Sequence, residues 1–129
     1  MERYLGRFSE PIYALMRFVT GFLFMFHGAQ KLFGVLGRDA AEAFTLMWFA
    51  GGIEFFGGLL VAIGLFAGWA AFLCSGQMAV AYFMAHQPEG LLPIQNKGEL
   101  AALYCWVFLF IAARGAGIWS VDAARGGSA

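Results

Sequence analysis

The chain has 129 residues, of which 61% are hydrophobic and 12% are charged, and its formal net charge is zero. Soluble domains carry roughly 25% charged residues, so this composition excludes a soluble surface and predicts one integral membrane domain over residues 1–129. The neutral balance and the lack of a basic tail exclude nucleic acid as an expected partner and leave the lipid bilayer.

Four apolar segments are long enough to form helices that cross a bilayer, whose hydrocarbon core of about 30 Å needs about 20 helical residues. Pro11 suits the first turn of the first helix. Arg3 and Arg7 precede this segment as in a signal peptide, but no A-x-A cleavage site directly follows it, so we expect it to remain as a helix. The sequence therefore predicts an all-α membrane protein, a bundle of four transmembrane helices over about residues 11–33, 43–65, 68–87 and 96–113.

The ends of these helices carry local signals. No Asp, Glu, Lys or Arg occurs from Phe55 to Pro88, and the glycine-bounded segment 64–69 predicts a tight reversal between the second and third helices. Asn96 followed by Glu99 has the spacing of a capping box at the start of the fourth helix. The small-residue tail Ala123–Ala129 is expected to be disordered.

An even number of spans places both termini on one side of the membrane. The basic residues favour cytoplasmic termini by the positive-inside rule. Four of them flank the side of the termini and three flank the other side: Arg3, Arg7, Arg114 and Arg125 against Lys31, Arg38 and Lys97.

Charged and polar side chains inside these apolar segments are the most informative feature of the sequence. Each charge costs at least ~2.5–3.5 kcal/mol at the bilayer centre, so such groups normally face the bundle interior and pair with one another. We therefore expect one buried polar or ligand site, formed by Arg17, His27, Lys31, Glu54, Gln77, Tyr82, His86 and Glu99.

Helical spacing places Lys31 and Glu54 on faces that also carry glycines, which allow a neighbouring helix to approach closely. A lone carboxylate in the membrane would take up a proton unless a cation were near, so Glu54 is expected to pair with Lys31 or with Arg17. Such a pair by itself favours a structural role over a ligand or proton site, whereas several buried polar groups together favour a functional site.

Other chemistry finds little support in the sequence. The two histidines lack the local spacing of metal ligands, so no metal site is expected. Cys74 and Cys105 lie in apolar runs, where packing is the main expectation and a thiol or disulfide role the alternative. No catalytic residue can be named.

Three ordered motifs resemble a known family. The first helix reads Arg17-x-x-x-Gly21, then His27-Gly28-x-x-Lys31-Leu32, and the second has Glu54-x-x-Gly57-Gly58. The fourth begins with Asn96-Lys97-Gly98-Glu99-Leu100 and is followed by the segment 115–122. In a chain of this length, the set resembles the DoxX family of small bacterial inner-membrane proteins. The family often has Asn-Gly-Gly-Glu, where this chain has Lys97 in the second place, and Gly-Pro-Gly followed by a basic residue, where this chain has Ala116 and Ile118. Both departures fall at helix ends.

The resemblance implies a four-helix bundle in the bacterial plasma membrane. The family takes its name from a subunit of a thiosulfate:quinone oxidoreductase, and relatives are associated with oxidative-stress complexes. Our first hypothesis is therefore a membrane subunit or accessory of a redox system, with a quinone as its ligand and a redox protein as its partner. The alternatives are a non-catalytic assembly or scaffold protein, and a small proton-coupled transporter that acts as a homo-oligomer with Glu54 as the titrating group.

Overall fold

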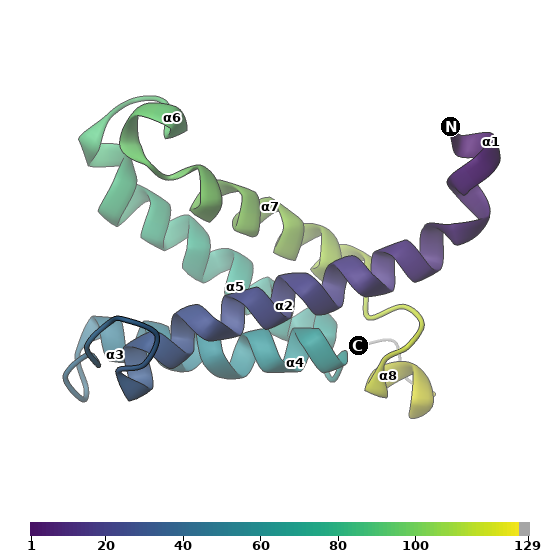
Figure 1. Cartoon of the computed structure of the whole chain (residues 1–129), viewed down its shortest axis with the longest axis horizontal. Coiled ribbons are helices and arrows are strands. Elements are labelled where there is room, and N and C mark those ends of the chain that lie inside the picture. The colour runs from purple at the N-terminus through teal and green to yellow at the C-terminus, as the bar shows by residue number, and fades with distance from the viewer. Residues whose placement is uncertain (127–129) are drawn as a thin grey trace.

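The computed structural model describes residues 1–126, and every regular element in that part of the chain is helical (Figure 1). The all-α class predicted from the sequence is therefore confirmed. The elements are α1 (Glu2–Leu5), the 3₁₀ turn η1 (Gly6–Phe8), α2 (Ser9–Phe33), α3 (Leu46–Gly52), the π-helical turn η2 (Ile53–Gly57), α4 (Gly58–Ile63), α5 (Ala67–Ala81), the π-helical turn η3 (Tyr82–His86), the 3₁₀ turn η4 (Gln87–Glu89), α6 (Pro93–Asn96), α7 (Glu99–Arg114) and α8 (Val121–Ala124).

Consecutive elements join into longer helical rods. Three of these, Glu2–Phe33, Leu46–Ile63 and Ala67–Glu89, are long and apolar enough to cross a membrane. The 16 residues of α7 extend about 24 Å at 1.5 Å per residue, less than the ~30 Å hydrocarbon core. By length, the structure thus supports three membrane-spanning helices with α7 as a shorter apolar helix.

Two pairs of helices form the body of the molecule. The rod α3–η2–α4 runs antiparallel along α2, and α5 runs antiparallel along α7 (Figure 1). One end of the bundle carries the loop between α2 and α3 together with α6, and the other end carries the N-terminus, the α4–α5 turn and α8. Phe24, Val61, Cys74 and Phe108 meet in the core and are at most 1% exposed.

Glycines allow α2 to lie directly on the second rod. A Cβ added at Gly28 would stand 2.2 Å from the backbone nitrogen of Phe55, and one at Gly21 would stand 2.5 Å from the carbonyl oxygen of Gly58. Real Cβ atoms do not approach backbone so closely, so both positions require glycine. This contact places the face of Lys31 directly against the face of Glu54.

The predicted reversal between the second and third helices is confirmed. Gly64 ends α4 with φ +74°, Phe66 has φ +49°, and α5 begins at Ala67. The carboxylate of Asp122 accepts hydrogen bonds from the backbone N–H groups of Phe66 (2.9 Å) and Ala67 (3.0 Å). A carboxylate at a helix N-terminus stabilises the N–H groups that have no partner within the helix.

Two predictions about the C-terminal half are wrong. Asn96 is not the N-cap of α7, because it ends α6 and the left-handed Lys97 (φ +60°) separates it from Glu99. The expected disorder from Ala123 onward is also corrected, since Ser120 caps the short helix α8, which includes Ala123 and Ala124. The last part of that tail, residues 127–129, lies outside the described residues.

Candidate functional site

The centre of the site is an ion pair between α2 and the second rod. Lys31 Nζ lies 2.6 Å from each carboxylate oxygen of Glu54. The side chain of Glu54 is 2% exposed and that of Lys31 is 12% exposed. The predicted pairing of Glu54 is therefore confirmed, with Lys31 as its partner. Because two charges here stabilise each other, both remain compatible with an apolar surrounding.

The local backbone determines where this carboxylate lies. Glu54 belongs to the π-helical turn η2, which interrupts the α-helical rod between α3 and α4. π-Helical turns inside α-helices occur frequently at functional sites. Glu54 is the eighth residue after Leu46, the first residue of α3, so its backbone lies roughly 12 Å from that end of the rod at 1.5 Å per residue.

Gln77 of α5 is the third member of the cluster. Its Nε2 lies 3.4 Å from Glu54 Oε1, at the long limit of a hydrogen bond. A carboxylate only accepts hydrogen bonds, so the amide nitrogen must face Glu54 and the amide oxygen must face away. Gln77 Oε1 is buried and has no hydrogen-bond partner among residues 1–126.

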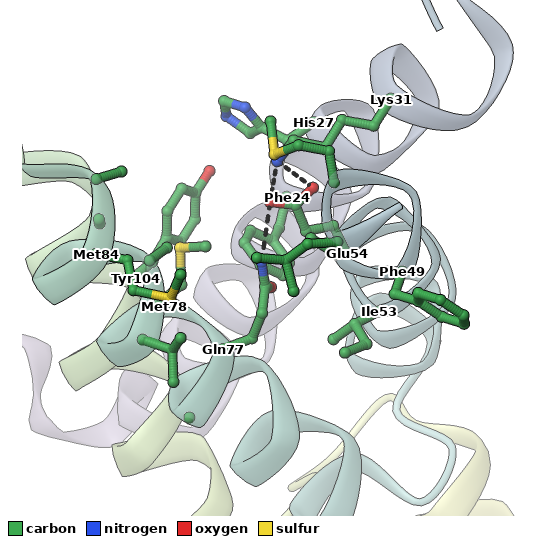
Figure 2. Close-up of a pocket in the computed structure, with 18 of the residues that line it drawn as sticks. Phe24, His27, Lys31, Phe49, Ile53, Glu54, Gln77, Met78, Met84 and Tyr104 are labelled. Atoms are coloured by element: carbon green, nitrogen blue, oxygen red, sulfur yellow. Dashed lines mark hydrogen bonds and ion pairs between the residues drawn. The ribbon is translucent and has the colours of Figure 1, made fainter. Parts of the chain in front are cut away.

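These three side chains lie at the wall of a cavity of about 850 Å³. Figure 2 shows Lys31, Glu54 and Gln77 from three different elements converging beside Phe24, Met78 and Tyr104. The remaining walls come from α3, α5, η3 and the first turns of α7, and most of the side chains are aliphatic or aromatic. The polar and charged lining residues are His27, Lys31, Arg38, Glu54, Gln77, His86, Lys97 and Tyr104.

The charge of the lining is predominantly positive. Lys31, Arg38 and Lys97 line the cavity, against Glu54 as the lining carboxylate among the described residues. The loops at this end of the bundle also carry four acidic residues that do not line it, Asp39, Glu42, Glu89 and Glu99. A polar group that enters the cavity thus meets an excess of hydrogen-bond donors.

Two histidines also line the cavity. His86 Nδ1 lies 3.1 Å from the carbonyl oxygen of Asn96, so this nitrogen carries a proton that it donates to that carbonyl. The ring of His27 stands edge-on to Tyr104, with 6.1 Å between the ring centroids. Among residues 1–126, no group of three His, Cys, Asp or Glu side chains is placed to hold a metal ion.

Arg17 lies at the opposite end of the bundle and outside this cavity. Its guanidinium group is 1% exposed and donates to the carbonyl oxygens of Val61 (3.1 Å), Ile118 (3.3 Å) and Trp119 (3.0 Å), and also to that of Ala116. We call the segment 115–124 the C-terminal clasp. Arg17 and Asp122 together attach the clasp to α2, α4 and α5.

Tyr82 and Glu99, which the sequence also assigned to the site, do not line the cavity. The Tyr82 hydroxyl accepts a hydrogen bond from Asn96 Nδ2 (3.1 Å), and Glu99 is exposed at the start of α7. Of the eight predicted residues, the structure therefore gathers five around the cavity: His27, Lys31, Glu54, Gln77 and His86.

Sequence reasoning missed two kinds of contributor. Tyr104 lies one helical turn before the buried Phe108, so its helical spacing could have indicated that it faces inward. Arg38 and Lys97 lie in loops, where no pattern indicates which way a side chain turns. The two cysteines are free thiols, and Cys74 packs in the core, in agreement with the packing role expected from the sequence.

Comparisons with known proteins agree with this architecture. The sequence profile of the DoxX family, described as DoxX, matches residues 12–87. The chain belongs to the DoxX family. Those residues include α2, the second rod and α5, and therefore Lys31, Glu54 and Gln77.

A protein of Haemophilus influenzae, described as uncharacterized, is similar over a longer stretch. It is 35% identical over 125 residues, which cover 92% of this chain and 93% of the relative. No solved structure matches the chain. This DoxX protein is accordingly a membrane protein of the family.

Proposed function

We propose that this DoxX protein binds a quinone in the cavity between α2, η2, α5 and α7, and that it serves as the membrane component of a quinone-linked redox system. The observation that carries the proposal is the combination of apolar walls with the donor groups of Lys31, His27 and Tyr104 at one place. A quinone ring needs apolar surroundings and its two carbonyl oxygens need donors.

The ion pair supports this assignment in a further way. Lys31 has three N–H donors and directs two of them to the oxygens of Glu54, which leaves the third for a carbonyl oxygen in the cavity. Glu54 thereby orients the ammonium group. In this proposal Lys31 is a binding residue and Glu54 is a positioning residue. Electrons would come from a partner protein that docks at the membrane surface.

The proposal includes the arrangement in the membrane. Four antiparallel helices, with α7 as the fourth span, place both termini on the cytoplasmic side and the cavity in the opposite half of the bilayer. The shortness of α7 is compatible with this because Lys97 and Arg114, near its two ends, have side chains long enough to reach the interfaces.

Binding of a short-tailed benzoquinone, measured by calorimetry in detergent, tests the proposal. Gly76 lines the cavity, and a Cβ added there would meet nothing within 4 Å. Gly76→Leu should therefore fold normally and fill part of the cavity. A quinone bound beside this leucine would overpack the cavity, which costs ~1–3 kcal/mol. We therefore expect the affinity of the variant for the quinone to fall about tenfold or more.

Ala113→Leu is the matched control, because Ala113 is exposed on α7 and lines neither this cavity nor the apolar groove beside it. It should bind the quinone as the unmodified protein does. Equal binding by Gly76→Leu, or the lack of saturable binding by the unmodified protein, would overturn the proposal. The second outcome would favour a scaffold role for the ion pair.

A further inference from the structure

A second cavity lies beside the first and differs from it in character. It measures about 610 Å³ and is lined by α3, η2, α4, α5 and the end of α2. Within the described residues 1–126, no charged side chain lines it, and its walls are large apolar side chains such as Leu32, Phe56 and Leu60. We call it the apolar groove.

The apolar groove adjoins the donor-lined cavity. Phe49, Ile53 and Leu73 line both spaces. Phe49 and Leu73 are about half exposed, so this shared wall lies at the surface of the bundle that faces lipid. Figure 2 shows Phe49 and Ile53 on the same side of the cavity as Glu54.

Apolarity alone would not assign an occupant, because lipid chains fill any groove on a membrane protein. The shared wall does assign one. A molecule whose polar head reaches Lys31 can extend its chain past Phe49, Ile53 and Leu73, between α3 and α5, into the neighbouring apolar groove. The polar head of such a molecule then lies against the donor-lined cavity, and its apolar chain lies against the apolar groove.

We propose that the ligand of this protein is a long-tailed isoprenoid quinone, and that its tail leaves the cavity over Phe49, Ile53 and Leu73 and lies in the apolar groove. This inference rests on the proposed function, since it concerns the other end of the same ligand. It makes the shared wall a specificity-determining element, which selects for quinones with a linear apolar chain.

Two glycines allow head and tail to be blocked separately. Gly52 lines the apolar groove only, has φ −61° and ψ −47°, and a Cβ added there would meet nothing within 4 Å. Gly76 lines the donor-lined cavity only. Gly52→Leu therefore fills the groove and Gly76→Leu the cavity, both in regular helix, where leucine is favoured over glycine.

The experiment uses a benzoquinone with a short isoprenoid tail that ends in a diazirine, added to the protein in phosphatidylcholine–phosphatidylglycerol nanodiscs. After irradiation, labelled peptides are mapped by mass spectrometry, with and without an excess of unlabelled quinone. We expect the displaceable label on residues 46–57 and 70–73. Gly52→Leu should lower that label several-fold, Ala113→Leu should leave it unchanged, and Gly76→Leu should remove it.

The outcomes separate this inference from the proposed function. Displaceable label spread over other lipid-facing helices, or label on 46–57 that Gly52→Leu does not lower, would overturn the inference while leaving quinone binding in place. Label that unlabelled quinone does not displace anywhere would overturn both. The map of the unmodified protein decides the matter even where a variant fails to fold.

Discussion

Breaking the Lys31–Glu54 pair from one side should destabilise the protein more than removing both partners. At 2.6 Å, the attraction between unit charges is about 6 kcal/mol at an effective dielectric constant of 20. Much of this is offset by the cost of removing both charges from water. Removing one partner forfeits the attraction but leaves the other charge buried, at a net cost of about 3–5 kcal/mol. Lys31→Met and Glu54→Gln should each lose this amount, and the double variant considerably less.

Thermal unfolding of all four proteins in the same detergent measures the effect. Glu99→Gln is the matched control, since that carboxylate is exposed on α7 and its neutralisation should change stability little. If the loss in the double variant equals the sum of the two single losses, the side chains do not interact and the reasoning is refuted. A double variant that is stable but no longer binds quinone would place the pair in the binding site.

Three further predictions concern the framework of the site. Gly28→Ala should strongly lower thermal stability, because the added Cβ would stand 2.2 Å from the backbone of η2. Gly76→Ala is the control and should be neutral or slightly stabilising, since its Cβ would meet nothing within 4 Å. Equal effects of the two substitutions would contradict the close approach of the helices. Arg17→Met should destabilise more than Asp122→Asn, because it leaves four clasp and α4 carbonyl oxygens without their donor. Asp122→Asn affects only two hydrogen bonds to a charged acceptor, worth about 1.5–3 kcal/mol each: it weakens one and removes the other, because an amide has a single acceptor oxygen. Protease resistance of the C-terminus in detergent reports both effects, and a fully resistant Arg17→Met would be the contrary result. A cysteine placed at Lys97 should react with impermeant thiol reagents from the extracytoplasmic side only, and labelling from the cytoplasmic side would reverse the proposed orientation.

Much of the framework follows from local sequence. The reversal at Gly64 could be predicted because a glycine and a short uncharged segment leave few alternatives for a chain that must return through the membrane. Helical faces that also carry glycines predicted that Glu54 pairs with a cation of the first helix, but they did not distinguish Lys31 from Arg17. Each of these features depends on residues a few positions apart, where helical periodicity is a reliable guide.

The remainder depends on long-range contacts that no local pattern specifies. Arg17 and Lys31 look alike in the sequence, but Arg17 reaches carbonyl oxygens 99–102 residues away and lies outside the cavity. Asn96 has the spacing of a cap, and a left-handed Lys97 redirects the backbone so that its side chain serves a loop instead. The composition of residues 53–57 likewise gives no indication of the π-helical turn that contains Glu54.

Native mass spectrometry of the protein purified from its membrane, with the lipids and quinones that remain bound, tests the central claim most directly. We expect the unmodified protein and Ala113→Leu to carry an isoprenoid quinone, and Gly76→Leu to be depleted of it at equal protein recovery. An equal quinone content in Gly76→Leu, or an unmodified protein that retains phospholipid but no quinone, would contradict the account.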